Sequence, residues 1–239
     1  MKRVLLLFLL LIAGIKLQAQ TAKDTKVYFS KALAMHLPKY DQKAKTAYRA
    51  RNYEEATALF ESFITNKLEG TYIDNFRFQN LKNKEISLYS FKKPVFLLTY
   101  ASWCVSGKGE ISALNALANK YKNKIDFVAL FWNKLQEAKQ GSKKFNAHIT
   151  VLYIDETQNT HSFVVRQLKH ALGLSNYLIS GDRRIVEISR SIAHPYSLSK
   201  EDSFQMNYEA MELAISKNLI KNASEVILDK KAEWRTSPN

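Results

Sequence analysis

Cysteine, proline and glycine are scarce in this chain of 239 residues. The single cysteine, Cys104, excludes an intrachain disulfide and any zinc site built from several cysteines. Seven glycines and four prolines exclude collagen-like and Gly/Pro-rich linker sequences. Apolar residues make up 46% of the chain and charged residues 24%, an ordinary globular composition that argues against wholesale disorder. The length suits one large domain or two small ones.

Basic residues outnumber acidic ones. The chain has 36 Lys and Arg against 22 Asp and Glu, which gives a formal charge of +14. The lysines are scattered and form no single basic block, which favours a solvated positive surface. Attraction to an anionic envelope surface or to an acidic partner is the alternative. We expect no nucleic-acid partner.

The first residues have the layout of a secretory signal peptide. A basic start at Met1–Arg3 precedes the apolar run Val4–Ile15, and Ala19 offers a small residue at the cleavage position. The run is shorter than the ~20 residues that span a bilayer. We therefore predict a signal peptide over residues 1–19 and export to the periplasm or cell envelope. An uncleaved signal would be the only membrane attachment. Cleavage removes three basic residues and no acid, leaving a charge of +11.

Residues 20–70 predict a helical lead-in. Tyr40–Arg51 and Tyr53–Lys67 carry apolar side chains three and four residues apart, the periodicity of amphipathic helices. The two stretches are broken at Asn52. Leu68–Thr71 is the best candidate boundary before the next segment.

Residues 71–222 alternate between expected strands and helices. Apolar runs at Pro94–Tyr100 and Ile125–Trp132 predict central strands buried on both faces. The helix expected between them, Val105–Tyr121, makes these strands adjacent and parallel. The pattern predicts an α/β fold with a mixed sheet flanked by helices. Further strands are expected at 76–78, 86–88, 149–154, 176–179 and 185–188.

Two later segments are expected to be helical. Residues 162–172 have a helical pattern in which Phe163 faces inward, and Gly173 ends it. A final helix is expected from about Lys200 to Ile220. Residues 223–239 are then predicted to form a charged tail with less order.

The segment with the clearest chemistry is Phe96–Cys104. It places a lone thiol just after a buried strand and at the start of a helix. The free N–H groups and the positive dipole end of a helix favour a thiolate, which lowers the thiol pKa below its free value of about 8.5. Trp103 would shield one side of the sulfur. The alternative is an inert, buried cysteine.

At this point the chain resembles a known family. Ala101–Cys104 (Ala-Ser-Trp-Cys), a following helix with Glu110, the strand Val151–Asp155, and Tyr177–Arg183 occur in the order seen in exported thioredoxin-like proteins of the TlpA/ResA type, within the redoxin group. The resemblance covers about residues 70–220. It implies a thioredoxin-like fold and exchange with protein or small-molecule thiols and disulfides. It also implies catalytic roles for Cys104, Trp103 and Glu110, with Glu110 as a buried proton carrier. A solvated first-turn glutamate is the alternative.

The departures from that family predict a degenerate active site. Gly107 stands where the second cysteine of the family motif belongs, and neither Leu174 nor Ser175 supplies the family's cis-proline. One thiolate attacks and a second thiol resolves the mixed disulfide in a dithiol cycle, which Cys104 cannot complete alone. Two hypotheses follow. The chain is an envelope protein that uses Cys104 for mixed-disulfide exchange or redox sensing, or it is a redox-inactive thioredoxin-fold binding module with an envelope protein partner.

The remaining candidates are weaker. Gly107 and Gly109 each cost ~1 kcal/mol inside a helix, so we expect the start of the active-site helix to loosen into a loop, with Lys108 exposed. The histidines share no metal-ligand spacing, and surface or structural roles are expected for them. We therefore expect no metal and no cofactor. The histidines concerned are His148, His161, His170 and His194.

Overall fold

The computed structural model describes residues 26–101, 107–190 and 198–236. For Asn159 and residues 220–236 it describes the backbone alone. The predicted signal peptide (1–19), Trp103, Cys104 and His194 therefore lie outside the described residues.

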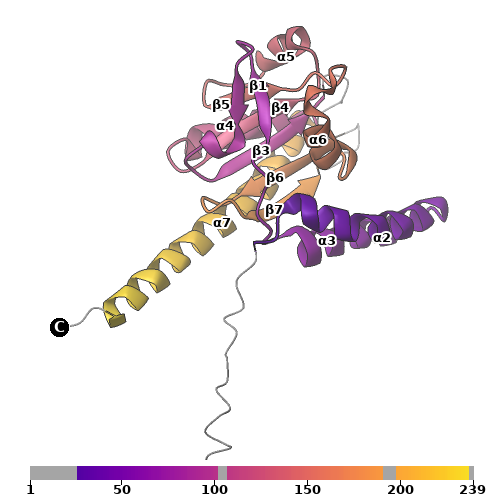
Figure 1. The fold of residues 1–239 in the computed structure, drawn as a ribbon. Helices are drawn as coiled ribbons and strands as arrows, with labels where there is room; N and C mark the ends of the chain where they lie inside the picture. The colour runs from indigo at the N-terminus through magenta and orange to yellow at the C-terminus, as the bar shows by residue number, and fades with distance from the viewer. Residues whose placement is uncertain (1–25, 102–106, 191–197, 237–239) are drawn as a thin grey trace, which may run out of the picture.

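A seven-stranded mixed sheet forms the centre of the molecule (Figure 1). Its strand order is β2-β1-β5-β4-β3-β6-β7. The pairs β3–β4 and β4–β5 are parallel, and the other four pairs are antiparallel. The strands are β1 (Arg77–Asn80), β2 (Glu85–Ser87), β3 (Val95–Tyr100), β4 (Asp126–Phe131), β5 (Ile149–Tyr153), β6 (Ser175–Ile179) and β7 (Ile185–Arg190).

The two central strands are those that the apolar runs predict. All six residues of β3 are buried, and β3 pairs in parallel with β4 from Val95↔Asp126 to Tyr100↔Phe131. The prediction of adjacent parallel strands is confirmed. A strand buried on both faces has no polar side, so its sequence shows a continuous apolar run and no alternation.

Helices cover both faces of the sheet. Two buried clusters lie on opposite faces, one including Leu114 and Ile215 from α4 and α7, the other including Leu33 and Leu168 from the lead-in and η4. The helices are α2 (Phe29–Arg49), α3 (Tyr53–Phe63), η1 (Ile64–Leu68), η2 (Leu88–Ser90), α4 (Glu110–Tyr121), α5 (Leu135–Ser142), η3 (Asn159–His161), α6 (Ser162–Val164), η4 (Val165–His170) and α7 (Lys200–Thr236). A parallel β3-α4-β4 unit and an antiparallel β6–β7 hairpin closed by a helix define a thioredoxin-like fold.

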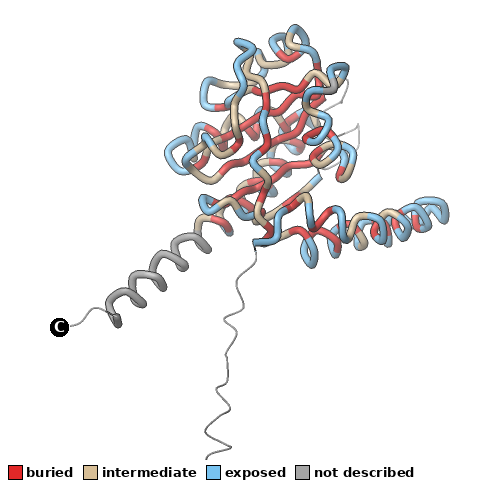
Figure 2. The backbone as a smooth tube through the Cα atoms, in the orientation of Figure 1, coloured by how far each residue is buried: buried red, intermediate tan, exposed pale blue. Residues whose placement is uncertain are grey.

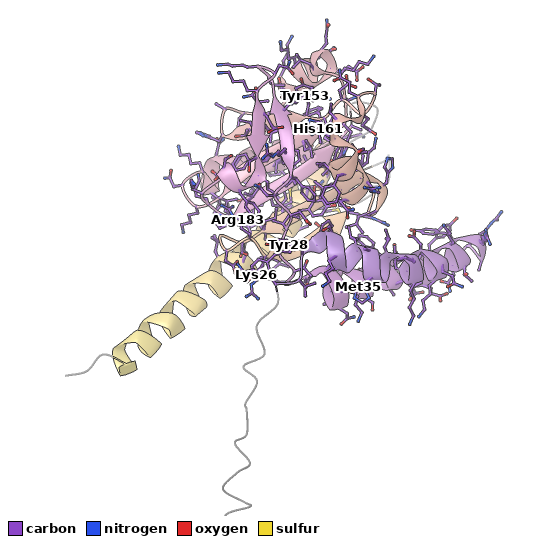
Figure 3. All side chains as sticks on the ribbon, viewed as in Figure 1. Lys26, Tyr28, Met35, Tyr153, His161 and Arg183 are labelled. Carbon is purple, nitrogen blue, oxygen red and sulfur yellow. The ribbon has the colours of Figure 1, made fainter. Side chains whose placement is uncertain are left out.

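The helical lead-in extends from one side of the sheet (Figure 1). Its inner residues are buried in the same core as the strands, whereas its outer end is largely exposed (Figure 2). Tyr28, at the base of α2 (Figure 3), forms a parallel bridge with Tyr72, and Tyr72 forms an antiparallel bridge with Arg184. The Arg190 guanidinium lies 3.8 Å from the centre of the Phe60 ring. The predicted boundary near residue 70 thus separates two segments that share one core.

Residues 70–73 follow the outer edge of β7. The Gly70 N–H donates to the Ile185 carbonyl, and the Ile185 N–H donates to the Thr71 carbonyl, each at 2.8 Å. The Ile73 N–H donates to the Arg183 carbonyl at 2.8 Å. The backbone of this segment therefore extends the sheet beyond β7.

Several predicted helix boundaries are wrong. The expected helix at 162–172 is one α-turn followed by the π-helical η4, and Phe163 is 43% exposed instead of facing inward. A π-turn holds more residues than an α-turn, which shifts the buried face. The final helix does not end near Ile220, since α7 continues to Thr236. Likewise α4 begins at Glu110 and not at Val105.

Within the described part of the chain, no helix combines the length and apolar character that crossing a membrane requires.

Candidate functional site

The sequence position of Cys104 falls in the link between β3 and α4. The described residues on either side are Ala101, fully buried after the end of β3, and Gly107, three residues before α4 begins. Cys104 and Trp103 themselves lie outside the described residues. Of the three predicted site residues, the structure places Glu110.

Glu110 is the first residue of α4 and is 6% exposed. The alternative of a solvated first-turn glutamate is therefore wrong. Its side chain borders a cavity of about 120 Å³ between the sheet and α7. The other residues that line this cavity are Phe96, Asn176, Glu187, Ser189, Arg190, Asn207, Ala210, Met211 and Ala214. The structure thus places the Glu110 side chain in the interior, between the sheet and α7.

The start of α7 covers the start of α4. The Gly109 N–H donates to Ser203 Oγ at 3.1 Å, and the Asn207 amide donates to the Ser203 carbonyl at 2.7 Å. A Cβ atom on Gly109 would lie 2.1 Å from the backbone nitrogen of Phe204. Gly109 thus permits a close backbone approach, and this approach keeps Glu110 away from solvent.

The two glycines before Glu110 act as predicted. Gly107 and Gly109 precede the helix, so neither residue destabilises α4 as a glycine inside a helix would. Lys108 is exposed, as expected, and its ammonium group donates to the Leu198 carbonyl at 3.1 Å. This contact ties the loop to the segment that leads into α7.

The position expected for the family's cis-proline has a different structure here. Among the described residues no peptide bond is cis, and Ser175 begins β6 as an ordinary strand residue. Thr99 Oγ accepts the Ser175 N–H and donates to the Ser175 carbonyl, both at 2.8 Å. Both backbone groups of Ser175 are therefore occupied within the protein.

Sequence reasoning missed four polar residues of this region: Thr99, Glu187, Ser203 and Asn207. Ser203 and Asn207 are 1% and 5% exposed, on the face of α7 that also buries Met211. Polar residues four apart at core positions of an amphipathic helix are a visible signal. Thr99 and Glu187 gave no such signal, because their partners come from distant parts of the chain.

Glu187 has an altered titration. Burial raises the pKa of its carboxyl above the ordinary value of 4.5, and the charge of Lys217 opposes part of this rise. A raised carboxyl pKa penalises the charged form in the folded state alone, so the penalty grows as pH rises above 4.5 and is absent at lower pH.

We therefore expect Glu187→Gln to be more stable than the natural chain at neutral pH, with the difference vanishing below about pH 4, where the carboxyl is protonated in both states. Urea unfolding of both proteins across this pH range measures it. Glu209→Gln, at an exposed position on α7, is the matched control. A difference that is constant with pH would contradict the assigned burial.

No metal site is found among the described residues, which hold no group of three or more His, Cys, Asp or Glu side chains arranged to bind an ion. His148 and His170 are exposed and His161 is partly exposed, in agreement with surface roles.

The chain matches no protein-family model. The solved structures to which it is similar over part of its length include three thioredoxin-like proteins. The first is a proposed thiol:disulfide interchange protein DsbE from Chlorobium tepidum, 20% identical, covering 63% of this chain and 97% of that one with a TM-score of 0.48. The second is a thioredoxin-like protein from Bacteroides caccae, 13% identical, covering 74% and 61% with a TM-score of 0.47.

The third is a secreted disulfide oxidoreductase from Mycobacterium tuberculosis, 15% identical, covering 57% and 96% with a TM-score of 0.41. With TM-scores below 0.5 these are likenesses only. The thioredoxin-like fold itself follows from the strand order and pairing of the sheet.

Proposed function

We propose that this chain is an exported thioredoxin-like protein that exchanges disulfides through one thiol, Cys104. The observation that carries the proposal is the burial of Glu110 at the start of α4, six residues after Cys104 in the link from the central strand β3. A strand-to-helix link with a helix N-terminus favours a thiolate. A buried carboxyl six residues further along the chain is a group that can take up or return the thiol proton.

The proposed reaction needs an external disulfide for its first half and an external thiol for its second half. The Cys104 thiolate attacks one sulfur of a partner disulfide, a new S–S bond forms, and the partner's other sulfur leaves as a thiolate. The proton released from Cys104 passes to water or to the Glu110 carboxylate. A second, external thiolate then attacks the mixed disulfide and restores Cys104, because Gly107 supplies no resolving thiol.

The start of β6 limits the partner's binding mode. Thr99 accepts the Ser175 N–H and donates to the Ser175 carbonyl, and Ser175 is 1% exposed, so an extended polypeptide does not reach these groups. This favours small disulfides, or a protein disulfide presented without strand addition at this position. The proposal includes cleavage of residues 1–19 and location in the periplasm or cell envelope, supported by the n-region, apolar run and small residue of that segment.

The reaction predicts one adduct and no dithiol turnover. Residues 20–239 incubated with oxidised glutathione should gain one glutathione per chain in intact-mass analysis, and dithiothreitol should remove it. The same protein should fail to reduce insulin disulfides, since it lacks a second thiol.

Cys104→Ser is the control and should gain nothing. Insulin reduction at the rate of a dithiol thioredoxin would refute the single-thiol reaction. Modification only after unfolding would show a sealed sulfur and would favour the redox-inactive binding module.

A further inference from the structure

A basic groove lies between the two helices of the lead-in. It encloses about 450 Å³ between α2 and the α3–η1 segment. Three lysines border it: Lys39 and Lys43 from α2 and Lys67 from η1. We call this cavity the α2–α3 groove. Its volume is in the range of ligand-binding clefts, about 300–1,000 Å³.

The charges of the groove are uncompensated. None of Lys39, Lys43 and Lys67 forms an ion pair among the described residues. No acidic side chain lines the groove, and a ring N–H of His36 adds a hydrogen-bond donor for an anion. Positive charges gathered around a concave surface repel one another, and an anionic ligand relieves that repulsion.

The base of the groove is formed by aromatic rings. The rings of Tyr40 and Phe63 are stacked, with centroids 4.6 Å apart and an angle of 10° between planes. Leu59 lies beside them, and the Asn66 amide donates to Ser62 Oγ at 3.1 Å on the rim. The groove therefore combines cationic groups, an apolar base and hydrogen-bonding amide and hydroxyl groups.

We infer that the α2–α3 groove binds an acidic peptide segment that also carries apolar side chains. The lysines match its carboxylates, the half-buried Leu59 beside the Tyr40–Phe63 pair matches its apolar side chains, and Ser62 and Asn66 match its backbone amides. Concavity favours a peptide over a flat anionic membrane, because Tyr40 and Phe63 are only 8% and 5% exposed at the base of the groove.

The groove is separate from the thiol chemistry. It lies in the lead-in, which extends away from the sheet (Figure 1), whereas Cys104 follows β3 at the centre of the sheet. Binding in the groove therefore needs no thiol, and the inference does not depend on the proposed disulfide exchange. All measurements use a Cys104→Ser background, so failure of one proposal leaves the other standing.

The test is binding of a fluorescein-labelled peptide of alternating glutamate and leucine or phenylalanine residues, measured by fluorescence anisotropy. The triple variant Lys39→Gln, Lys43→Gln and Lys67→Gln should weaken binding about tenfold or more, since three exposed charge contacts together contribute about that factor. The matched control has the same net charge: Lys82→Gln, Lys84→Gln and Lys124→Gln, all exposed and outside the groove. It should change the affinity less than twofold.

Circular dichroism confirms that both triple variants are folded. A second variant, Leu59→Gln, should weaken binding of the peptide without changing any charge. Equal weakening by both triple variants would overturn the inference in favour of unspecific charge attraction. Absence of peptide binding would also overturn it, as would groove-dependent binding to phosphatidylglycerol vesicles with none to the peptide.

Discussion

Gly109→Ala is expected to destabilise the protein by about 2–3 kcal/mol, the upper range for overpacking a close contact. The added Cβ would lie 2.1 Å from the Phe204 nitrogen and 2.7 Å from the Ser203 carbonyl carbon. All of these are backbone atoms, so no side-chain rotation relieves the clash. The helix α7 must shift, and the bond from Gly109 to Ser203 Oγ is strained or lost.

Urea unfolding of the two proteins measures this effect. Gly181→Ala is the matched control, because Gly181 has no atom within 4 Å of an added Cβ, and it should change stability by less than about 0.5 kcal/mol. A Gly109→Ala protein as stable as the natural chain would show that α7 does not contact the start of α4.

Thr99→Val should cost about 2–4 kcal/mol. Valine matches threonine in shape but has no hydroxyl, so it leaves both the N–H and the carbonyl of Ser175 without their partner. Ser175 is 1% exposed, and each buried backbone group without a partner costs about 1–3 kcal/mol.

Thr99→Ser separates this effect from packing, since it keeps the hydroxyl and loses one methyl group. It should retain most of the stability in thermal unfolding. Equal losses in the two variants would show that the methyl group, and not the pair of hydrogen bonds, holds β6 to β3 at this point.

The sequence predicted those parts of the fold that depend on local pattern. The central strands were visible because burial on both faces demands a continuous apolar run, as in Val95–Tyr100. The helical lead-in was visible from its periodicity, although the clear periodic stretch began only at Tyr40, whereas α2 begins at Phe29 and passes through Pro38. Packing of the inner face of α2 outweighs the local cost of that proline.

The parts that escaped prediction depend on contacts between distant residues. The sequence pattern of a glutamate in the first turn of a helix is the same whether its side chain is buried or solvated. Glu110 is buried by α7, which lies about 90 residues later in the chain. The role of Thr99 likewise depends on Ser175, 76 residues away. Periodicity describes one element at a time and carries no information about which other element packs against it.

The extension of the sheet by residues 70–73 has a consequence for folding order. An open strand edge is a template for pairing with other chains and so for aggregation. Here the segment that covers β7 precedes it in the chain by more than 100 residues. A chain that emerges N-terminus first, from the ribosome or through a membrane channel, therefore contains residues 70–73 before β7 has been made. Residues 70–73 are thus already present when β7 is made, and they can pair with its free edge as soon as it forms.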